Sequence, residues 1–285
     1  MKHTLLLLTL TICYSLSFSQ NKTVNNQPKP FVLGEIHELQ SAILSEKRIL
    51  NIYLPEGYNA SDTAKYPVVY LLDGGADEDF IHITGLYQFD SFQWINRVPR
   101  SIIVGIANTS RRRDMTYPTN DTAARRRYPE AGHSDKFISF LQQELQPYIQ
   151  KKFKTTSSKT IIGESLGGLL AAEILLKNPK LFNNYIIVSP SIWWNNGSLL
   201  NLSSPILQEG FSQKTIVYIG VGKEGLTSGN PPRMMEADAN WLADKIKNTK
   251  SKAVTVYFDY LPQEDHATIM HQAVFNALRM MNPPK

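Results

Sequence analysis

The chain has 285 residues, of which 42% are hydrophobic and 19% charged, and its formal net charge at pH 7 is +5. This composition excludes a disordered or collagen-like chain, and the length suits one large α/β domain with a sizeable core. The mild basicity gives little support for nucleic-acid binding, and it favours anionic small molecules over cationic ones as partners.

Residues 1–19 have the pattern of a secretory signal peptide. An apolar stretch from Leu5 to Cys13 follows a basic start, and the small residues Ser17 and Ser19 precede a cleavage site after Ser19. A membrane anchor is the alternative, but a span needs about 20 apolar residues and this stretch is much shorter. We therefore expect an exported protein, periplasmic or secreted, with no stable membrane insertion.

The mature chain should contain no cysteine. Removal of 19 of the 285 residues leaves 266, and the only cysteine, Cys13, is lost with them. Disulfides and sulfur ligands for a metal are then excluded. Residues 20–30 are polar and include two prolines, which predicts a disordered lead-in. One α/β domain is expected over residues 31–285.

The strand pattern predicts an α/β fold. Apolar and polar residues roughly alternate over residues 33–44 and 47–54, which predicts an antiparallel hairpin with a corner at Ser45 and Glu46. Continuous apolar runs, typical of strands buried on both faces, follow at 66–72, 102–106, 160–162, 185–188, 215–219 and 254–258. Segments long enough for crossover helices separate these runs. We therefore expect a mostly parallel central sheet with helices on both faces.

Two of the expected helices flank the candidate site in the sequence. Residues 134–152 place apolar side chains at three- and four-residue spacing, which predicts an amphipathic helix that leads into the strand at 160–162. Residues 230–247 form the second expected helix, entered through Pro231 and Pro232, with a Met and Trp stripe interpreted as core packing.

One short segment, Gly163 to Gly167, matches the G-x-S-x-G nucleophile elbow. Such a turn holds its serine in a strained backbone conformation, so that the hydroxyl projects from the top of a sheet. An apolar run precedes the segment and a helical apolar pattern follows it. An incidental serine in a glycine-rich turn is the alternative, but this context favours Ser165 as a nucleophile.

A serine nucleophile needs a histidine base near neutral pH. In folds that carry this elbow the chain order is serine, acid, histidine, and only His266 and His271 lie beyond Ser165. His266 follows the last predicted strand, at the sheet edge where ligands bind, and is preferred over His271 in the closing helix. These two histidines are five residues apart, about 140° around a helix, which argues against a metal site formed by that pair.

Position in the fold selects the acid. Glu224 follows the strand at 215–219, so it lies at the same edge as Ser165 and His266, and a glutamate can orient an imidazole as an aspartate does. The alternative is a solvated turn residue beside Lys223. The reserves are two carboxyl groups on the next helix, Glu236 and Asp238. Nine carboxyl side chains lie between the serine and the histidine: Glu173, Glu209, Glu224, Glu236, Asp238, Asp244, Asp259, Glu264 and Asp265.

The oxyanion hole is expected to combine two backbone N–H groups. One belongs to Leu166, the residue after the nucleophile. The other belongs to Gly74 or Gly75, because these glycines end the first long buried strand and permit close backbone approach. A plain turn is the alternative interpretation of the two glycines.

Six segments carry a resemblance to a known family. They are YPVVYLLDGG at 66–75, RRRDMTYPT at 111–119, the run 135–154 with ELQPYI, GESLGG at 163–168, SPSIWW at 189–194 and EDHATIM at 264–270. With them the chain resembles the putative-esterase branch of the α/β-hydrolase superfamily, which includes siderophore esterases, S-formylglutathione hydrolases and feruloyl or acetylxylan esterases. The resemblance covers nearly all of the mature chain, and SPSIWW is most similar to the siderophore-esterase subgroup.

The resemblance implies an α/β-hydrolase fold over residues 31–285 and a serine esterase that needs no cofactor. Ser165, activated by His266, would attack an ester carbonyl and form an acyl-enzyme that water then hydrolyses. Two departures concern the substrate. Glu164 stands where many relatives have histidine or tyrosine, and Ala267 stands where glycine often follows the histidine.

The expected substrate is a bulky anionic or aromatic ester, with a siderophore trilactone first and a feruloyl or acetyl ester of a polysaccharide second. Guanidinium groups suit carboxylates and catecholates, although most arginine runs are solvated loop charges. Tryptophans can supply an aromatic wall, although one of them can instead pack in the core. The residues expected to contact substrate are Arg111, Arg112, Arg113, Trp193, Trp194 and Glu164, with a second arginine run at 125–127.

Two other classes of function stay open. An acyltransferase would deliver the acyl group to an alcohol instead of water, and a secreted binding protein would keep the fold without turnover. The intact serine and histidine argue against the second class. The sequence predicts no nucleic-acid partner, a small-molecule or glycan ester as substrate, and no particular oligomeric state.

Overall fold

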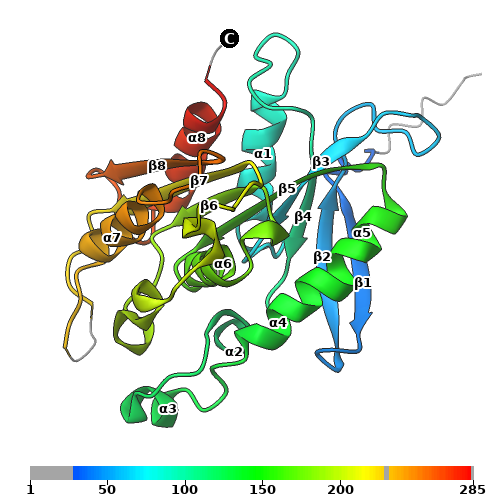
Figure 1. The fold of residues 1–285 in the computed structure, drawn as a ribbon. Helices are drawn as coiled ribbons and strands as arrows, with labels where there is room; N and C mark the ends of the chain where they lie inside the picture. The colour runs from blue at the N-terminus through cyan, green and yellow to red at the C-terminus, as the bar shows by residue number, and fades with distance from the viewer. Residues whose placement is uncertain (1–27, 228–230, 284–285) are drawn as a thin grey trace, which may run out of the picture. The chain divides into compact units, whose positions relative to one another are not determined.

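Eight strands form one mixed sheet in the computed structural model, in the order β1-β2-β4-β3-β5-β6-β7-β8 (Figure 1). The structure describes residues 28–227 and 231–283, so the predicted signal peptide and most of the predicted lead-in lie outside the described residues. Contacts divide the chain into two units, residues 1–32 and 33–285, and the strands and helices of the described residues belong to the second.

The predicted hairpin and parallel sheet are confirmed. The hairpin is β1 (Glu35–Ser41) with β2 (Glu46–Tyr53), and β2 also pairs antiparallel with β4 (Ile102–Ile106). All other neighbours are parallel: β3 (Tyr66–Leu71), β5 (Thr155–Glu164), β6 (Asn184–Val188), β7 (Thr215–Gly222) and β8 (Val254–Leu261). The polar first half of β5 escaped prediction, because only its second half is a continuous apolar run.

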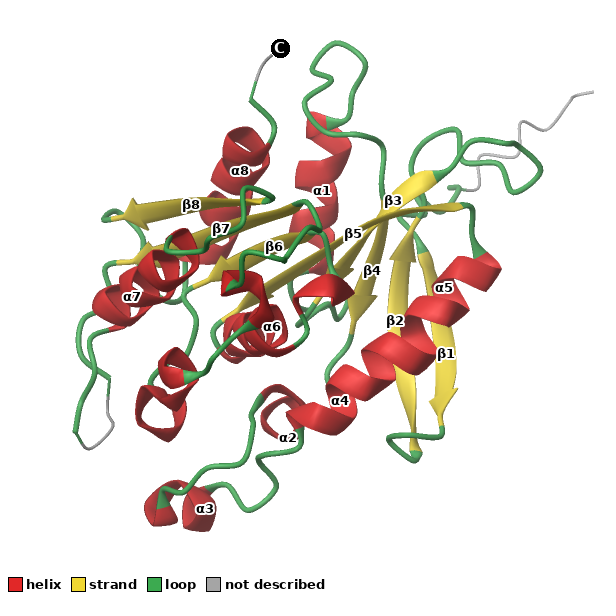
Figure 2. Cartoon of the chain, viewed as in Figure 1, coloured by secondary structure: helices red, strands yellow, loops and turns green. Residues whose placement is uncertain are grey.

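Helices cover both faces of the sheet (Figure 2). One face packs against α1 (Phe80–Asp90) and α8 (Ile269–Met281). The other packs against α4 (Ser134–Phe140), α5 (Gln146–Lys152), α6 (Leu166–Lys177) and α7 (Met235–Lys247). Along β3, Val69 and Leu71 pack in the core beneath α1 and α8, while Val68 and Tyr70 pack in the core on the opposite face. This alternation follows from the two-residue period of a strand.

The two predicted helices differ from expectation in detail. The helix over 134–152 is present, with a π-helical turn at Leu141–Leu145 between α4 and α5. The helix expected from residue 230 begins only at Met235, because the backbone of Met234 is extended and forms an antiparallel bridge with Leu226. The Met and Trp stripe is only partly core, since Trp241 is 55% exposed.

Shorter helices lie mostly in the connections. They are α2 (Arg111–Met115), α3 (Thr122–Arg127) and the 3-10 helices Pro179–Leu181, Trp194–Asn201 and Pro205–Leu207. Across residues 28–227 and 231–283, no helix has both the length and the apolar character that a membrane span requires. The loops after the parallel strands meet at the carboxyl edge of the sheet, and that edge carries the candidate site.

Candidate active site

Ser165 lies in the sharp turn between β5 and α6, with φ 57° and ψ −114°. A Cβ atom at Gly163 would lie 2.5 Å from the backbone of Gly167, and one at Gly168 would lie 2.7 Å from the carbonyl oxygen of Val188. Only glycine fits where backbones approach this closely. The segment therefore has the geometry of a nucleophile elbow, with its serine in the left-handed region of backbone space.

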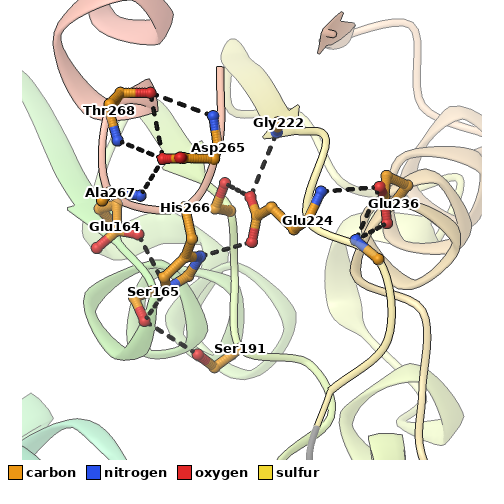
Figure 3. Close-up of polar contacts among 12 residues, drawn as sticks. Glu164, Ser165, Ser191, Gly222, Glu224, Glu236, Asp265, His266, Ala267 and Thr268 are labelled. Atoms are coloured by element: carbon orange, nitrogen blue, oxygen red, sulfur yellow. Dashed lines mark hydrogen bonds and ion pairs between the residues drawn. The ribbon is translucent and has the colours of Figure 1, made fainter. Parts of the chain in front are cut away.

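Three predicted residues form one hydrogen-bonded chain (Figure 3). His266 Nε2 lies 2.9 Å from Ser165 Oγ, and His266 Nδ1 lies 2.5 Å from Glu224 Oε2. Since the carboxylate accepts from Nδ1–H, the lone pair of Nε2 faces the serine hydroxyl, which donates to it. This arrangement can take a proton from the serine and stabilise the resulting imidazolium.

Glu224 has several donors around its carboxylate. Ser189 Oγ donates to its Oε1, as does the backbone N–H of Gly222 at 3.3 Å. Burial raises the pKa of Glu224, but hydrogen bonds from His266 and Ser189 outweigh burial and lower the pKa overall. The hydrogen bond to Glu224, opposed by burial, raises the pKa of His266 above 6.5. The carboxylate is therefore ionised at neutral pH and favours a protonated imidazole.

The two reserve acids have other partners. Glu236 accepts from the backbone N–H groups of Glu224 and Gly225 at 2.9 and 3.0 Å, and so supports the Glu224 loop. Buried Asp238 pairs with Arg233 at 2.5 Å. Neither carboxyl group contacts His266 in the described part of the chain, and Glu224 alone of the three does.

Glu164 adds a second carboxyl group beside the histidine. Its Oε1 lies 3.3 Å from His266 Nε2, yet no donor bonds to this buried oxygen among the described residues. Burial raises the pKa of Glu164 to about 8, even though His266 and Arg111 oppose the shift. Glu164 is therefore mostly protonated at pH 7, next to the same nitrogen that faces the serine.

The prediction for Gly74 is wrong. Its N–H donates to the carbonyl oxygen of Ile106 at 3.0 Å, which continues the pairing of β3 and β4 and leaves no donor for an oxyanion. The N–H of Gly75 donates to Glu78 Oε2 at 2.8 Å, and Asn108 donates to the other oxygen of this exposed carboxylate at 2.8 Å. Leu166 opens α6, where the first backbone N–H groups have no partner within the helix. Leu166 and Gly75 therefore stay the predicted oxyanion donors, with the Gly75 N–H bonded to Glu78 in this structure.

Arg111 lies at the site, where its guanidinium bonds to other residues of the protein. Its guanidinium donates to both carboxylate oxygens of Asp73 at 2.6 and 2.9 Å and to the carbonyl oxygen of Glu164 at 3.2 Å. Asn108 donates to the same carboxylate at 2.7 Å. Arg111 thus connects the loop after β3 to the nucleophile elbow, and its contact with substrate stays a prediction.

The other two arginines of the run face elsewhere. The guanidinium of Arg112 lies over the ring of Tyr128, 3.7 Å from its centroid, and the Arg112 residue is partly exposed. Arg113 bonds to Glu46 at 2.6 Å and to Asp114 at 2.8 Å, and Asp114 also accepts from buried Arg48. This ion-pair cluster anchors α2 to β2. The prediction that Arg113 contacts substrate is therefore wrong.

Trp194 is also a structural residue. Its side chain is 1% exposed, and its Nε1–H donates to the carbonyl oxygen of Tyr117 at 2.7 Å, while the Tyr117 hydroxyl donates back to the carbonyl oxygen of Trp194 at 3.1 Å. Burial explains why the prediction of a substrate contact fails here. Trp193 is half-buried and packs edge-on against Trp194, with ring centroids 6.3 Å apart.

Sequence reasoning missed four supporting residues. Ser191 Oγ lies 3.3 Å from Ser165 Oγ, and Ser189 bonds to Glu224. Asp265 accepts from the N–H groups of Ala267 and Thr268, which fixes the turn that carries His266. Asp73 holds Arg111. Their positions were the available signal, because all four follow strands at the carboxyl edge of the sheet. The sequence spacing does not show which way a side chain points, so their contacts could not be predicted.

Comparisons with known proteins indicate the family and the fold. A family model described as "Putative esterase" matches residues 41–269. Among curated proteins, the chain is 27% identical over 257 residues to the ferri-bacillibactin esterase BesA of Bacillus subtilis, covering 84% of this chain and 87% of that protein.

Solved structures show the same fold. An IroE-like serine hydrolase from Shewanella oneidensis matches with a TM-score of 0.75 and 29% identity, over 87% of this chain and 80% of that one. The BES protein from Bacillus cereus matches with a TM-score of 0.73 and 28% identity, over 93% of this chain and 100% of that one.

Proposed function

The chain belongs to the putative-esterase family and is a carboxylic ester hydrolase, and we propose on this premise that it works through an acyl-enzyme on Ser165. The observation that carries the proposal is the uninterrupted chain of hydrogen bonds from Glu224 through His266 to Ser165. Each of the three residues follows a different parallel strand. They are far apart in the sequence, and the sheet brings them together at its carboxyl edge.

In the first step, His266 Nε2 takes the proton of Ser165 Oγ as this oxygen attacks the ester carbonyl carbon. The N–H groups of Leu166 and Gly75 would stabilise the tetrahedral oxyanion, once the Glu78 carboxylate has left the Gly75 amide. His266 then donates its proton to the leaving alcohol. Water repeats the sequence on the acyl-enzyme and releases the acid.

The proposed substrate class is a siderophore ester, such as a catecholate trilactone. Similarity to a ferri-bacillibactin esterase over 84% of this chain supports this class. The arginines of α3 add support, because Arg125, Arg126 and Arg127 are exposed beyond the carboxyl end of β4 and attract anions. A cleaved signal peptide over residues 1–19 would place the enzyme outside the cytoplasm.

The test is covalent labelling with a fluorophosphonate together with hydrolysis of a p-nitrophenyl ester. Ser165→Ala should lose the label and lower kcat by about 10⁴-fold or more, as loss of a triad nucleophile does. Ser191→Ala is the matched control, because its hydroxyl neighbours Ser165 without contacting His266. Unchanged hydrolysis by Ser165→Ala would end the proposal.

A further inference from the structure

Two histidines from opposite ends of the domain meet on the face of the sheet that α1 and α8 cover. His82 lies on α1 and His271 on α8, 189 residues apart in the sequence. Their Nδ1 atoms are 3.2 Å apart, and the ring centroids are 5.3 Å apart with 33° between the ring planes. The His82 side chain is 34% exposed, so solvent reaches the pair.

A carboxylate orients the first of these rings. Asp79 Oδ1 lies 2.9 Å from His82 Nε2 and accepts its N–H. The proton on Nε2 leaves Nδ1 of His82 as the nitrogen with a free lone pair, and this atom points at His271. Asp79 makes no capping bond to α1 with its side chain, and its carboxylate instead bonds to the imidazole. A carboxylate behind a histidine is the usual second partner of a metal-binding imidazole.

We propose that His82 and His271 chelate one divalent transition-metal ion through their two Nδ1 atoms. Zinc bound to imidazole nitrogen at about 2.0–2.1 Å in tetrahedral geometry sets two ligand atoms roughly 3.3 Å apart, close to the observed separation. Imidazole suits Zn²⁺, Cu²⁺ and Ni²⁺ better than Mg²⁺ or Ca²⁺. Within the described residues, no three His, Cys, Asp or Glu side chains gather around one point, so water would complete the coordination.

The position of the pair gives the metal a structural effect. α1 follows the loop that contains Gly75, and α8 follows the loop that contains His266. A metal held by one histidine of each helix would fix these two helix starts relative to each other, and with them the loops of the proposed oxyanion donor and base. The bound ion should therefore raise the midpoint of thermal unfolding.

Sequence spacing could not have revealed this site. The spacing argument against a metal concerned His266 with His271 and assumed one helix through both, whereas α8 begins at Ile269 and the His266 ring bonds to Ser165 and Glu224. The observed partner of His271 comes from another helix, and only the packing of α1 against α8 brings the two rings together.

The experiment is a calorimetric titration of the untagged full chain with ZnCl₂ and NiCl₂ at pH 8, where competition with protons is small. The wild-type chain should bind the metal, and His82→Ala and His271→Ala should each lose this binding and the metal-dependent rise in unfolding temperature. Asp79→Asn should weaken binding by about 10–100-fold. His133→Ala, which removes an exposed histidine at the start of α4, should bind as the wild type does.

Circular dichroism of each metal-free variant separates loss of the site from loss of the fold, and it does not depend on the proposed function. No binding by the wild-type chain, or undiminished binding by folded His82→Ala and His271→Ala, overturns the proposal. Loss of binding in His133→Ala alone would also overturn it, because the ion would then bind elsewhere.

Discussion

At the scale of single residues, Glu164 and His266 set the pH dependence. The imidazole must be neutral to accept the serine proton, and its pKa lies above 6.5, so kcat/KM should rise with pH through a value above 6.5. Glu164 ionises near pH 8. Its negative charge would then oppose the developing oxyanion, so activity should fall again above that pH. Initial rates between pH 5 and 10 measure both limbs.

The variant Glu164→Gln tests whether Glu164 causes the predicted fall of activity above pH 8. The amide keeps the shape of the protonated carboxyl group, so activity at pH 7 should be retained and the fall near pH 8 should disappear. The pKa of Glu164 is raised in the fold, so its contribution to stability is present below pH 4.5 and lost as pH rises through 8. The variant should therefore resist urea better than the wild type at pH 9. Identical alkaline limbs in both proteins would contradict this role for Glu164.

Glu224 is the second residue with a defined effect. Glu224→Gln should lower kcat by about 10²–10⁴-fold, because the imidazole loses the anion that fixes its tautomer and stabilises its charge. Steady-state kinetics on a p-nitrophenyl ester give the value, with circular dichroism as a check of folding.

The control for Glu224→Gln is the same substitution at Glu236, on α7. Glu236→Gln keeps an oxygen acceptor for the two backbone N–H groups that Glu236 binds, so kcat should change by less than about tenfold. A severe loss in Glu236→Gln together with a benign Glu224→Gln would assign the acid elsewhere.

At the scale of elements, α2 positions the two halves of the site. The planar guanidinium of Arg111 bonds to Asp73 and to the Glu164 carbonyl oxygen at the same time. Lysine cannot make these bonds together. Arg111→Lys should therefore lower kcat by about 10–100-fold with little change in KM, since the oxyanion loop shifts relative to Ser165.

Arg112→Lys is the control for Arg111, because Arg112 lies over Tyr128 one residue further along α2. It should keep kcat within a factor of a few of the wild type. A rise in KM with unchanged kcat in Arg111→Lys would instead mean that Arg111 binds substrate, as the sequence predicts.

At the scale of the whole molecule, charge should govern substrate choice. The value of kcat/KM for a catecholate trilactone should exceed that for p-nitrophenyl acetate, feruloyl xylan or acetylated xylan by roughly 10–100-fold. Replacing Arg125, Arg126 and Arg127 with glutamine should reduce this preference and its dependence on salt, because long-range attraction of the anion is lost. A preference for the small neutral ester would contradict a siderophore substrate, but it would not affect the assignment as an ester hydrolase.

Sequence reasoning was most successful where one residue type fits one backbone position. The strands were predictable from continuous apolar runs, and the places of Ser165, His266 and Glu224 followed from the strands that precede them. The method failed where a residue had a choice of partners. Nothing in the sequence distinguishes Arg111 at the site from Arg113 in the cluster with Glu46, because that choice depends on packing between β2 and α2.

Three side chains around the site hold backbone conformations that glycine adopts more easily. Asp73, Ser165 and Ser189 have φ angles of 51°, 57° and 41°, and each such angle costs on the order of 1–3 kcal/mol in a residue with a Cβ atom. Glycine at any of the three positions would relieve this strain, but it would remove the partner of Arg111, the proposed nucleophile or a donor to Glu224. The strained backbone is therefore coupled to the site, and a gain in thermal stability at these positions should come with a loss of activity.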